Sequence, residues 1–198
     1  LTHNPHWSAV YRLTTTRFYK VTHNILSFLA IKTLDSPLNL CHHLNRMPNV
    51  FLYGPDTFRK RTFDRIGGCP ILGAAKLDGF ALTFNKPNMK NRQEGLPNLM
   101  AEEGAVTHGV VFELEEKQVE NLDGYFGGYQ KQNIKVYLRK THEDIEVFSY
   151  FARRTKGSLK PSPQIRALCI QGAEENSLPR DFVENLMHLP TWPLVIYG

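Results

Sequence analysis

The chain has 198 residues, with a hydrophobic fraction of 41% and a charged fraction of 22%, which is typical of a folded globular protein and excludes global disorder. This length predicts one well-packed domain with an appendage rather than two full domains. The longest apolar run, ILSFLAI at 25–31, is far shorter than the roughly 20 residues that a membrane-spanning helix needs.

The net charge of +5 is concentrated at the beginning of the chain, because the first 50 residues hold five Lys and Arg residues and a single acid, Asp35. An acid-poor, Thr-rich and Arg-containing beginning is typical of a mitochondrial targeting region or of the segment just after one. A basic arm that binds a partner has the same composition. We therefore expect residues 1–48 to form a basic N-terminal extension, with an amphipathic helix at 19–34, and we expect the mitochondrial matrix as location, with the cytoplasm as the alternative.

The three cysteines, Cys41, Cys69 and Cys169, are too widely separated for a CxxC pair or a disulfide framework, which favours a reducing compartment. Cys41 precedes His42 and His43, but a zinc site needs further ligands at a supporting spacing, and none lies nearby. The sequence therefore predicts no metal site.

The domain itself is expected at 49–190, with strand patterns first and most helices late. A short helix with one buried and one basic face is predicted at 57–66, and another at 115–126. The segment at 161–189 predicts a helix interrupted by a glycine break, then a second helix after Pro179. The predicted strands are at 49–54, 74–84, 104–114, 129–139 and 146–153.

This order predicts an α+β fold around a mixed, strongly curved sheet. The last residues, 191–198, are apolar, proline-broken and Trp-containing, and we expect them to form a C-terminal docking tail.

Four segments, in this order, resemble the γ-glutamylcyclotransferase (AIG2-like) superfamily. They are VFLYG at 50–54, HGVVFEL at 108–114, LDGYFGGY at 122–129, and the stretch at 160–186 with its PSP opening, GA pair and LP step. The resemblance implies a small mixed β-barrel with flanking helices.

The resemblance also implies a reaction, in which the α-amine of a γ-glutamyl compound attacks its own γ-carbonyl and releases 5-oxoproline. Such chemistry needs a general acid/base and backbone N–H donors for the substrate carboxylate and the developing oxyanion. No cofactor is implied.

Three departures from the family pattern are expected to fall on one pocket. The glutamate of the family's LDxxEG turn aligns with Phe126, the serine of its YGS-type loop aligns with Pro55, and a tyrosine near the PSP step aligns with Ile165. Proline has no backbone N–H and phenylalanine has no proton to transfer, so we predict no catalytic residue, with Phe126 marking a degenerate site. The predicted vestigial pocket comprises Tyr53, Gly54, Pro55, Asp56, Phe126, Gly127 and Ile165.

An active enzyme with a relocated acid/base is the alternative, with Asp56, Glu94, Glu102 or Glu103 as the carboxylate. The interpretation that we prefer makes Asp56 a cap of the following helix and the glutamates solvated loop charges. A pocket that binds a γ-glutamyl compound without converting it is a third hypothesis.

Two clusters of basic residues could neutralise phosphates, although such clusters are usually only solvated faces. With the basic extension, they lead us to predict a non-catalytic structural subunit of a larger, RNA-containing mitochondrial assembly such as the mitochondrial ribosome, with other protein subunits and ribosomal RNA as partners. The predicted nucleic-acid contacts are Arg59, Lys60, Arg61 and Arg65 in the first cluster and Arg153, Arg154, Lys156 and Lys160 in the second.

Overall fold

The computed structural model describes residues 47–157 and 159–192. All of these residues belong to the unit Met47–Gly198. The predicted helix at 19–34, the Cys41 cluster and residues 193–198 of the predicted tail lie outside the described residues. Within them, no helix is long and apolar enough to cross a membrane.

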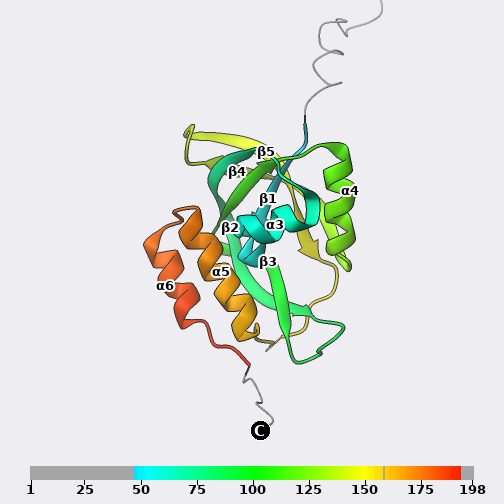
Figure 1. Ribbon diagram of the computed structural model, residues 1–198. Coiled ribbons are helices and arrows are strands. Elements are labelled where there is room, and N and C mark those ends of the chain that lie inside the picture. Colours follow the sequence, from blue (N-terminus) through cyan, green and yellow to red (C-terminus); the bar gives the residue numbers. More distant parts are fainter. Residues whose placement is uncertain (1–46, 158, 193–198) are drawn as a thin grey trace, which may run out of the picture. The chain divides into compact units, whose positions relative to one another are not determined.

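Five strands form a closed barrel in the order β1-β3-β2-β4-β5, which confirms the predicted α+β fold with a small mixed barrel (Figure 1). β1 runs parallel to β5, and every other pairing is antiparallel. The strands are β1 Asn49–Tyr53, β2 Ile71–Pro87, β3 Gly95–Glu113, β4 Tyr129–Leu138 and β5 Glu143–Ala152.

β2 and β3 form one long hairpin whose pairing runs from Ile71↔Phe112 to Pro87↔Gly95. The sequence predicted the middle of β2, at 74–84, and the C-terminal half of β3, at 104–114. Polar and proline residues interrupt the apolar alternation in the N-terminal half of β3, which is a strand because it pairs with β2.

β1 is buried on both faces, so its alternating side chains enter two different apolar clusters. Phe51 and Tyr53 face the barrel interior, whereas Val50 and Leu52 pack outside the barrel with Leu114 and other residues. A strand covered on both sides reads as a continuous apolar run, which is why NVFLYG could be recognised from sequence.

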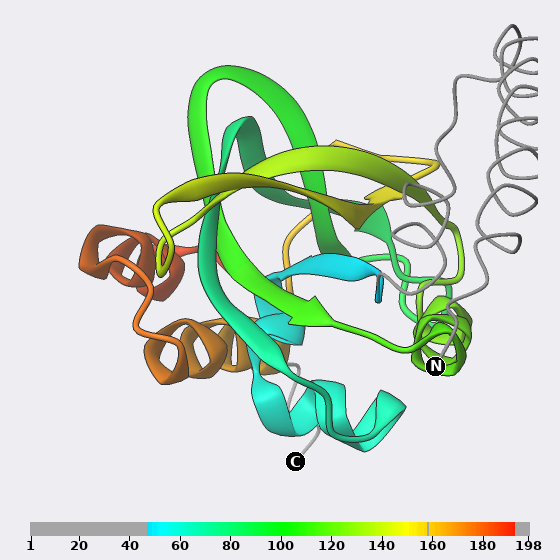
Figure 2. The same ribbon diagram turned by 90° about the horizontal axis from the view of Figure 1, so that it is seen from above.

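Helices cover the barrel from several sides, and Figures 1 and 2 both show α5 and α6 on one side and α4 on the opposite side. All the helical segments that the sequence predicted within the described residues are present. They are the helices α3 Arg59–Ile66, α4 Glu116–Tyr125, α5 Pro163–Glu175 and α6 Arg180–His188, and a 3-10 turn that was not predicted, η2 Gly54–Thr57, precedes α3.

The predicted glycine break in the first C-terminal helix is wrong, because α5 continues through Gly172 to Glu175. Gly172 lies where α5 packs against η2, and a Cβ atom there would lie 2.2 Å from Oγ1 of Thr57. The glycine therefore permits a close approach between two elements instead of ending a helix.

Candidate functional site

The site begins at the loop that leaves β1. Gly54 has a φ of +60°, and Oγ1 of Thr57 donates a 2.7 Å hydrogen bond to its carbonyl oxygen. Pro55 follows at the start of η2, and all four residues of this turn are buried. The chain is thus held tightly at the position that the resemblance assigns to a substrate-binding loop, with no backbone N–H at residue 55.

Asp56 does not cap α3, so that prediction is wrong. The N-cap is Phe58, with no side-chain capping bond. The Asp56 side chain is only 7% exposed, and its Oδ1 accepts bonds of 2.8 Å from Nε of Arg61 and 2.6 Å from an Nη atom of Arg65. The two arginines stand one turn apart on α3, so both guanidinium groups reach the same buried carboxylate.

Phe126 lies at the C-terminus of α4 and is 9% exposed. Its ring stacks on Tyr150 with centroids 3.9 Å apart and an interplanar angle of 7°, and it meets the edge of Tyr129 at 5.2 Å. The position that the resemblance aligns with a glutamate is therefore filled by an aromatic ring within the apolar cluster outside the barrel.

These elements enclose a cavity of about 70 Å³, well below the roughly 300 Å³ at which ligand pockets begin. Four members of the predicted pocket, Pro55, Asp56, Phe126 and Ile165, line it together. The full lining is Pro55, Asp56, Arg61, Arg65, Leu96, Pro97, Tyr125, Phe126, Tyr129 and Ile165.

The other three predicted pocket residues are not among those that line the cavity. Tyr53 is buried in the barrel interior, and its hydroxyl donates to the carbonyl of Tyr150. Gly54 forms the turn, and Gly127 is exposed beyond Phe126.

Sequence reasoning missed the cavity's arginine and tyrosine lining. Arg61 and Arg65 were assigned to a nucleic-acid face, and although their i, i+4 spacing places them on the same side of α3, nothing local indicated that both bind Asp56, which precedes the helix. Tyr129, whose hydroxyl donates a 2.7 Å bond to the Pro97 carbonyl, left no comparable sign in the sequence.

Few of the described residues at this site could act as an acid or base. Burial is the main cause that raises the pKa of Tyr129, which lines the cavity, and of Tyr53, which does not, so both stay protonated at neutral pH. Asp56 is the one carboxylate in the lining, and it is already paired with two guanidinium groups.

The candidate relocated bases lie elsewhere. Glu94 is in the turn of the β2–β3 hairpin, where its carboxylate accepts a bond from the Asn88 amide. Glu102 and Glu103 are exposed on β3. None of the three lines the cavity.

The two predicted nucleic-acid clusters differ in their charge partners. Every member of the α3 cluster is ion-paired: Arg61 and Arg65 with Asp56, and the other two as Arg59 with Glu175 and Lys60 with Asp64. The second cluster, Arg153, Arg154, Lys156 and Lys160, is exposed and forms no ion pair within the described part of the chain.

No group of three or more His, Cys, Asp or Glu side chains in residues 47–157 and 159–192 could hold a metal ion. Cys69 and Cys169 are both free thiols. Burial raises the pKa of Cys69 to about 11, so it remains protonated at neutral pH and is a poor nucleophile.

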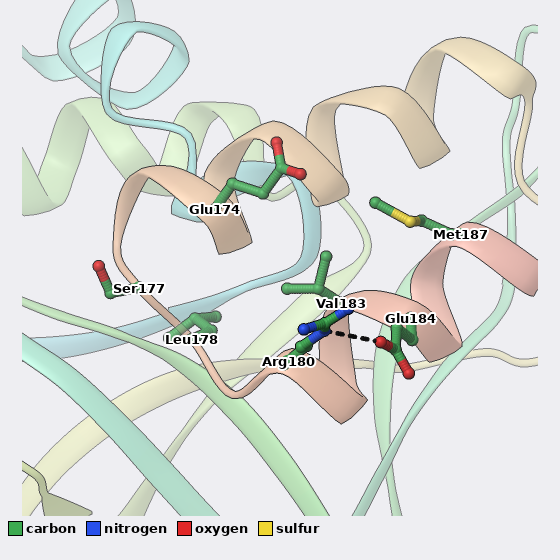
Figure 3. Close-up of a pocket in the computed structure, with 7 residues that line it drawn as sticks. All are labelled: Glu174, Ser177, Leu178, Arg180, Val183, Glu184 and Met187. Carbon is green, nitrogen blue, oxygen red and sulfur yellow. Dashed lines mark hydrogen bonds and ion pairs between the residues drawn. The ribbon is translucent and has the colours of Figure 1, made fainter.

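A second, larger hollow of about 390 Å³ lies between the end of α5 and α6 (Figure 3). Leu178 and Val183 form part of its apolar wall, and Arg180 pairs with Glu184 at 2.9 Å on α6. It shares no residue with the predicted pocket. Its lining is Glu174, Ser177, Leu178, Arg180, Val183, Glu184 and Met187.

Comparison with known proteins agrees with this architecture. Residues 106–186 match the model of the AIG2-like family. The γ-glutamylcyclotransferases of Homo sapiens and Mus musculus are 28% and 29% identical over 143 residues, which cover 69% of this chain and 75% of each relative.

Solved structures show the same fold. A γ-glutamyl cyclotransferase superposes with a TM-score of 0.69 at 24% identity, over 75% of this chain and 91% of that one. An uncharacterised protein from Homo sapiens also gives 0.69, at 25% identity, over 78% of this chain and 93% of its own. In sequence and in fold, the chain is therefore similar to the γ-glutamylcyclotransferase-like (AIG2-like) superfamily, which confirms the resemblance that the four sequence segments indicated.

Proposed function

We propose that this chain is a non-catalytic member of the superfamily that serves as a structural subunit of a larger RNA-containing assembly, such as the mitochondrial ribosome. The first part of the proposal, the absence of catalysis, is supported by the residues that line the pocket. Phe126 is stacked on Tyr150 at the aligned glutamate position, and the one lining carboxylate, Asp56, is held by Arg61 and Arg65. A general acid/base needs a group that is free to exchange a proton with the substrate.

The cavity volume supports the same proposal. A γ-glutamyl dipeptide has to lie with its amine and carbonyl against the base, and a cavity of about 70 Å³ is too small for it. Phe126 forms part of the wall, and enlarging the cavity on its side would break the stacking with Tyr150 and expose buried aromatic surface.

The second part of the proposal, the assembly, is supported by charge. The first 50 residues are basic, with one acid, and the exposed cluster around Arg153 has no ion-pair partner among the described residues. The acid-poor beginning supports a mitochondrial matrix location. Its partners would then be other protein subunits and ribosomal RNA.

Catalysis is tested by the release of 5-oxoproline from γ-glutamyl-alanine. We expect none from the native protein, and we expect a gain when the pair Phe126→Glu and Pro55→Ser restores a carboxylate and a backbone donor. Turnover by the native protein that Asp56→Asn abolishes would make the chain an active cyclotransferase with a relocated base. That is the second candidate function, favoured by the names of the relatives and by the carboxylate in the lining.

The assembly is tested by sedimenting the native protein from a gentle cell lysate with and without ribonuclease. We expect migration in a large particle that collapses after ribonuclease treatment. Migration near the size of a monomer or dimer in both samples would overturn the assembly role and leave the cyclotransferase and small-ligand hypotheses.

A further inference from the structure

The end of the β2–β3 hairpin and the segment between β5 and α5 lie side by side. The N–H of Lys156 donates a 2.8 Å bond to the Asn85 carbonyl, and the N–H of Gly95 donates a 2.8 Å bond to the Lys160 carbonyl. Figure 1 shows this hairpin end next to the chain that leads to α5. We call the basic side chains of these two stretches the hairpin-end surface: Lys86, Lys90, Arg92, Arg153, Arg154, Lys156 and Lys160.

The charged residues of this surface are almost all positive. Residues 85–95 and 153–160 hold seven Lys and Arg residues and one acid, Glu94. None of the seven forms an ion pair with a described residue, and the Glu94 carboxylate is bonded to the Asn88 amide. Six of the seven are exposed, and Lys86 is the exception.

Lys86 as a whole is 7% exposed, although its ammonium nitrogen is not among the fully buried polar atoms that lack a partner. Its Nζ lies 4.8 Å from the ring centroid of Tyr129, and the ring face offers no lone pair. Arg153 converges on the same place, because its Nε donates a 3.0 Å bond to the Tyr129 carbonyl. Burial lowers the pKa of Lys86, which is the expected effect when a charge lacks an anionic partner.

The surrounding groups indicate which kind of anion this surface could bind. Asparagine and glutamine side chains contact phosphate and sugar oxygens in nucleic-acid complexes, and Asn85, Asn88, Asn91 and Gln93 stand among the cations. The exposed large apolar side chain here is Met89, at 82%, so the surface has neither a ring on which bases could stack nor the apolar row that a membrane-bound surface needs.

We propose that the hairpin-end surface binds the phosphate backbone of RNA, without reading base sequence, and that the basic face of α3 does not. The inference rests on the proposed role in an RNA-containing assembly and names the surface that meets the RNA. Ion pairing separates the two basic regions, because an arginine already bonded to a carboxylate releases fewer counterions from RNA.

The test is fluorescence anisotropy with the purified full chain and a labelled polyuridine oligonucleotide. Two double variants remove the same charge: Arg154→Gln with Lys156→Gln on the surface, and Arg59→Gln with Lys60→Gln on α3. At about 100 mM salt the first pair of substitutions should weaken binding at least about tenfold. The plot of log affinity against log salt concentration should become shallower by about 1.4 if each residue contacts one phosphate of a single strand. The α3 pair should stay within about twofold.

Equal losses from both pairs would overturn the surface assignment, because they would report only net charge. An absence of polyuridine binding by the native chain would overturn the RNA inference. In that case ribonuclease-sensitive sedimentation would still support the assembly, with protein subunits as the contact. Tighter binding to phosphatidylserine vesicles than to polyuridine would also overturn the inference, in favour of a membrane.

Lys86→Met adds a readout that distinguishes ligand binding from structure. A partly buried ammonium without an anionic partner adds little to the stability of a fold, so an apolar replacement of similar length should leave the melting temperature unchanged or raise it while weakening polyuridine binding about threefold or more. A lowered melting temperature with unchanged binding would make Lys86 a structural residue and remove it from the surface.

Discussion

Phe126 is the residue that links the stability of the fold to the proposed loss of catalysis. Its ring stacks on Tyr150 and packs into the apolar cluster outside the barrel. Phe126→Ala would remove this packing and leave a cavity, so we expect it to lower the free energy of unfolding by about 3 kcal/mol in urea titration. Tyr125→Ala is the matched control, since its ring is 56% exposed, and it should lower that free energy by less than about 1 kcal/mol.

A similar effect of the two alanine variants would contradict the assignment of Phe126 as a packed core residue. A larger loss of stability from Phe126→Ala than from Tyr125→Ala would show that the Phe126 ring contributes to the fold, at the position where the resemblance places a glutamate. A charged glutamate at residue 126 would lie between two aromatic rings, where burial penalises its ionised form.

Residue identities at this site were partly predictable. The prediction that Pro55 and Phe126 share one pocket came from the flanking LYG and LD motifs, and both residues line the cavity. The role of Asp56 was not visible, because a carboxylate next to a helix start is usually a cap. Its pairing with Arg61 and Arg65 depends on how α3 leaves η2.

At the scale of elements, the contact between α5 and η2 sets the shape of the cavity, and Gly172 permits it. Gly172→Ala should lower the free energy of unfolding by about 2 kcal/mol or more, because a Cβ atom would lie 2.2 Å from Thr57 Oγ1 and 2.5 Å from the Phe58 nitrogen. Gly124→Ala in α4 meets no atom within 4 Å and should raise that free energy by up to about 1 kcal/mol. Thermal and urea unfolding of both variants would measure the difference.

Equal stabilisation by both substitutions would mean that α5 does not approach η2 this closely. The helix break predicted at Gly172 failed for the same reason. The local sequence shows only that glycine disfavours a helix interior. The close contact that calls for a glycine here is with Thr57, which is distant in the chain.

The docking of α6 on the barrel should depend on pH through His108 of β3. Its ring meets Phe182 of α6 at 5.2 Å, and its pKa is lowered from 6.5, chiefly by burial, while Asp181 opposes the shift. Between the lowered folded value and the unfolded value, the unfolded chain binds more protons. Stability should therefore be constant above about pH 6.5 and fall as the pH drops below it.

The measurement is the free energy of unfolding in urea at several pH values on both sides of neutrality. His108→Gln should remove part of the acid-side decline, whereas His188→Gln, at an exposed position at the end of α6, should leave the decline intact. A decline of the same size in both variants would exclude His108 as its source.

At the scale of the whole molecule, the barrel is closed by a short parallel seam between β1 and β5, for which a single register pair, Val50↔Phe148, is formed. Two side chains strengthen it: Oγ of Ser149 donates a 2.7 Å bond to the Phe51 carbonyl, and the Tyr53 hydroxyl donates to the Tyr150 carbonyl. The family resemblance implied a barrel, but local patterns alone could not predict its closure, because these partners are 98 and 97 residues apart and local patterns define strands but not their neighbours.

This closure gives Tyr53 a structural role that can be separated from any ligand role. Tyr53→Phe removes a buried donor and should lower the free energy of unfolding by about 1–2 kcal/mol, and Ser149→Ala should act similarly. Tyr137→Phe, whose hydroxyl meets the exposed His142, should change it by less than about 0.5 kcal/mol. If Tyr53→Phe instead left stability unchanged and altered binding of a γ-glutamyl compound, the hydroxyl would belong to a ligand site rather than to the seam that closes the barrel.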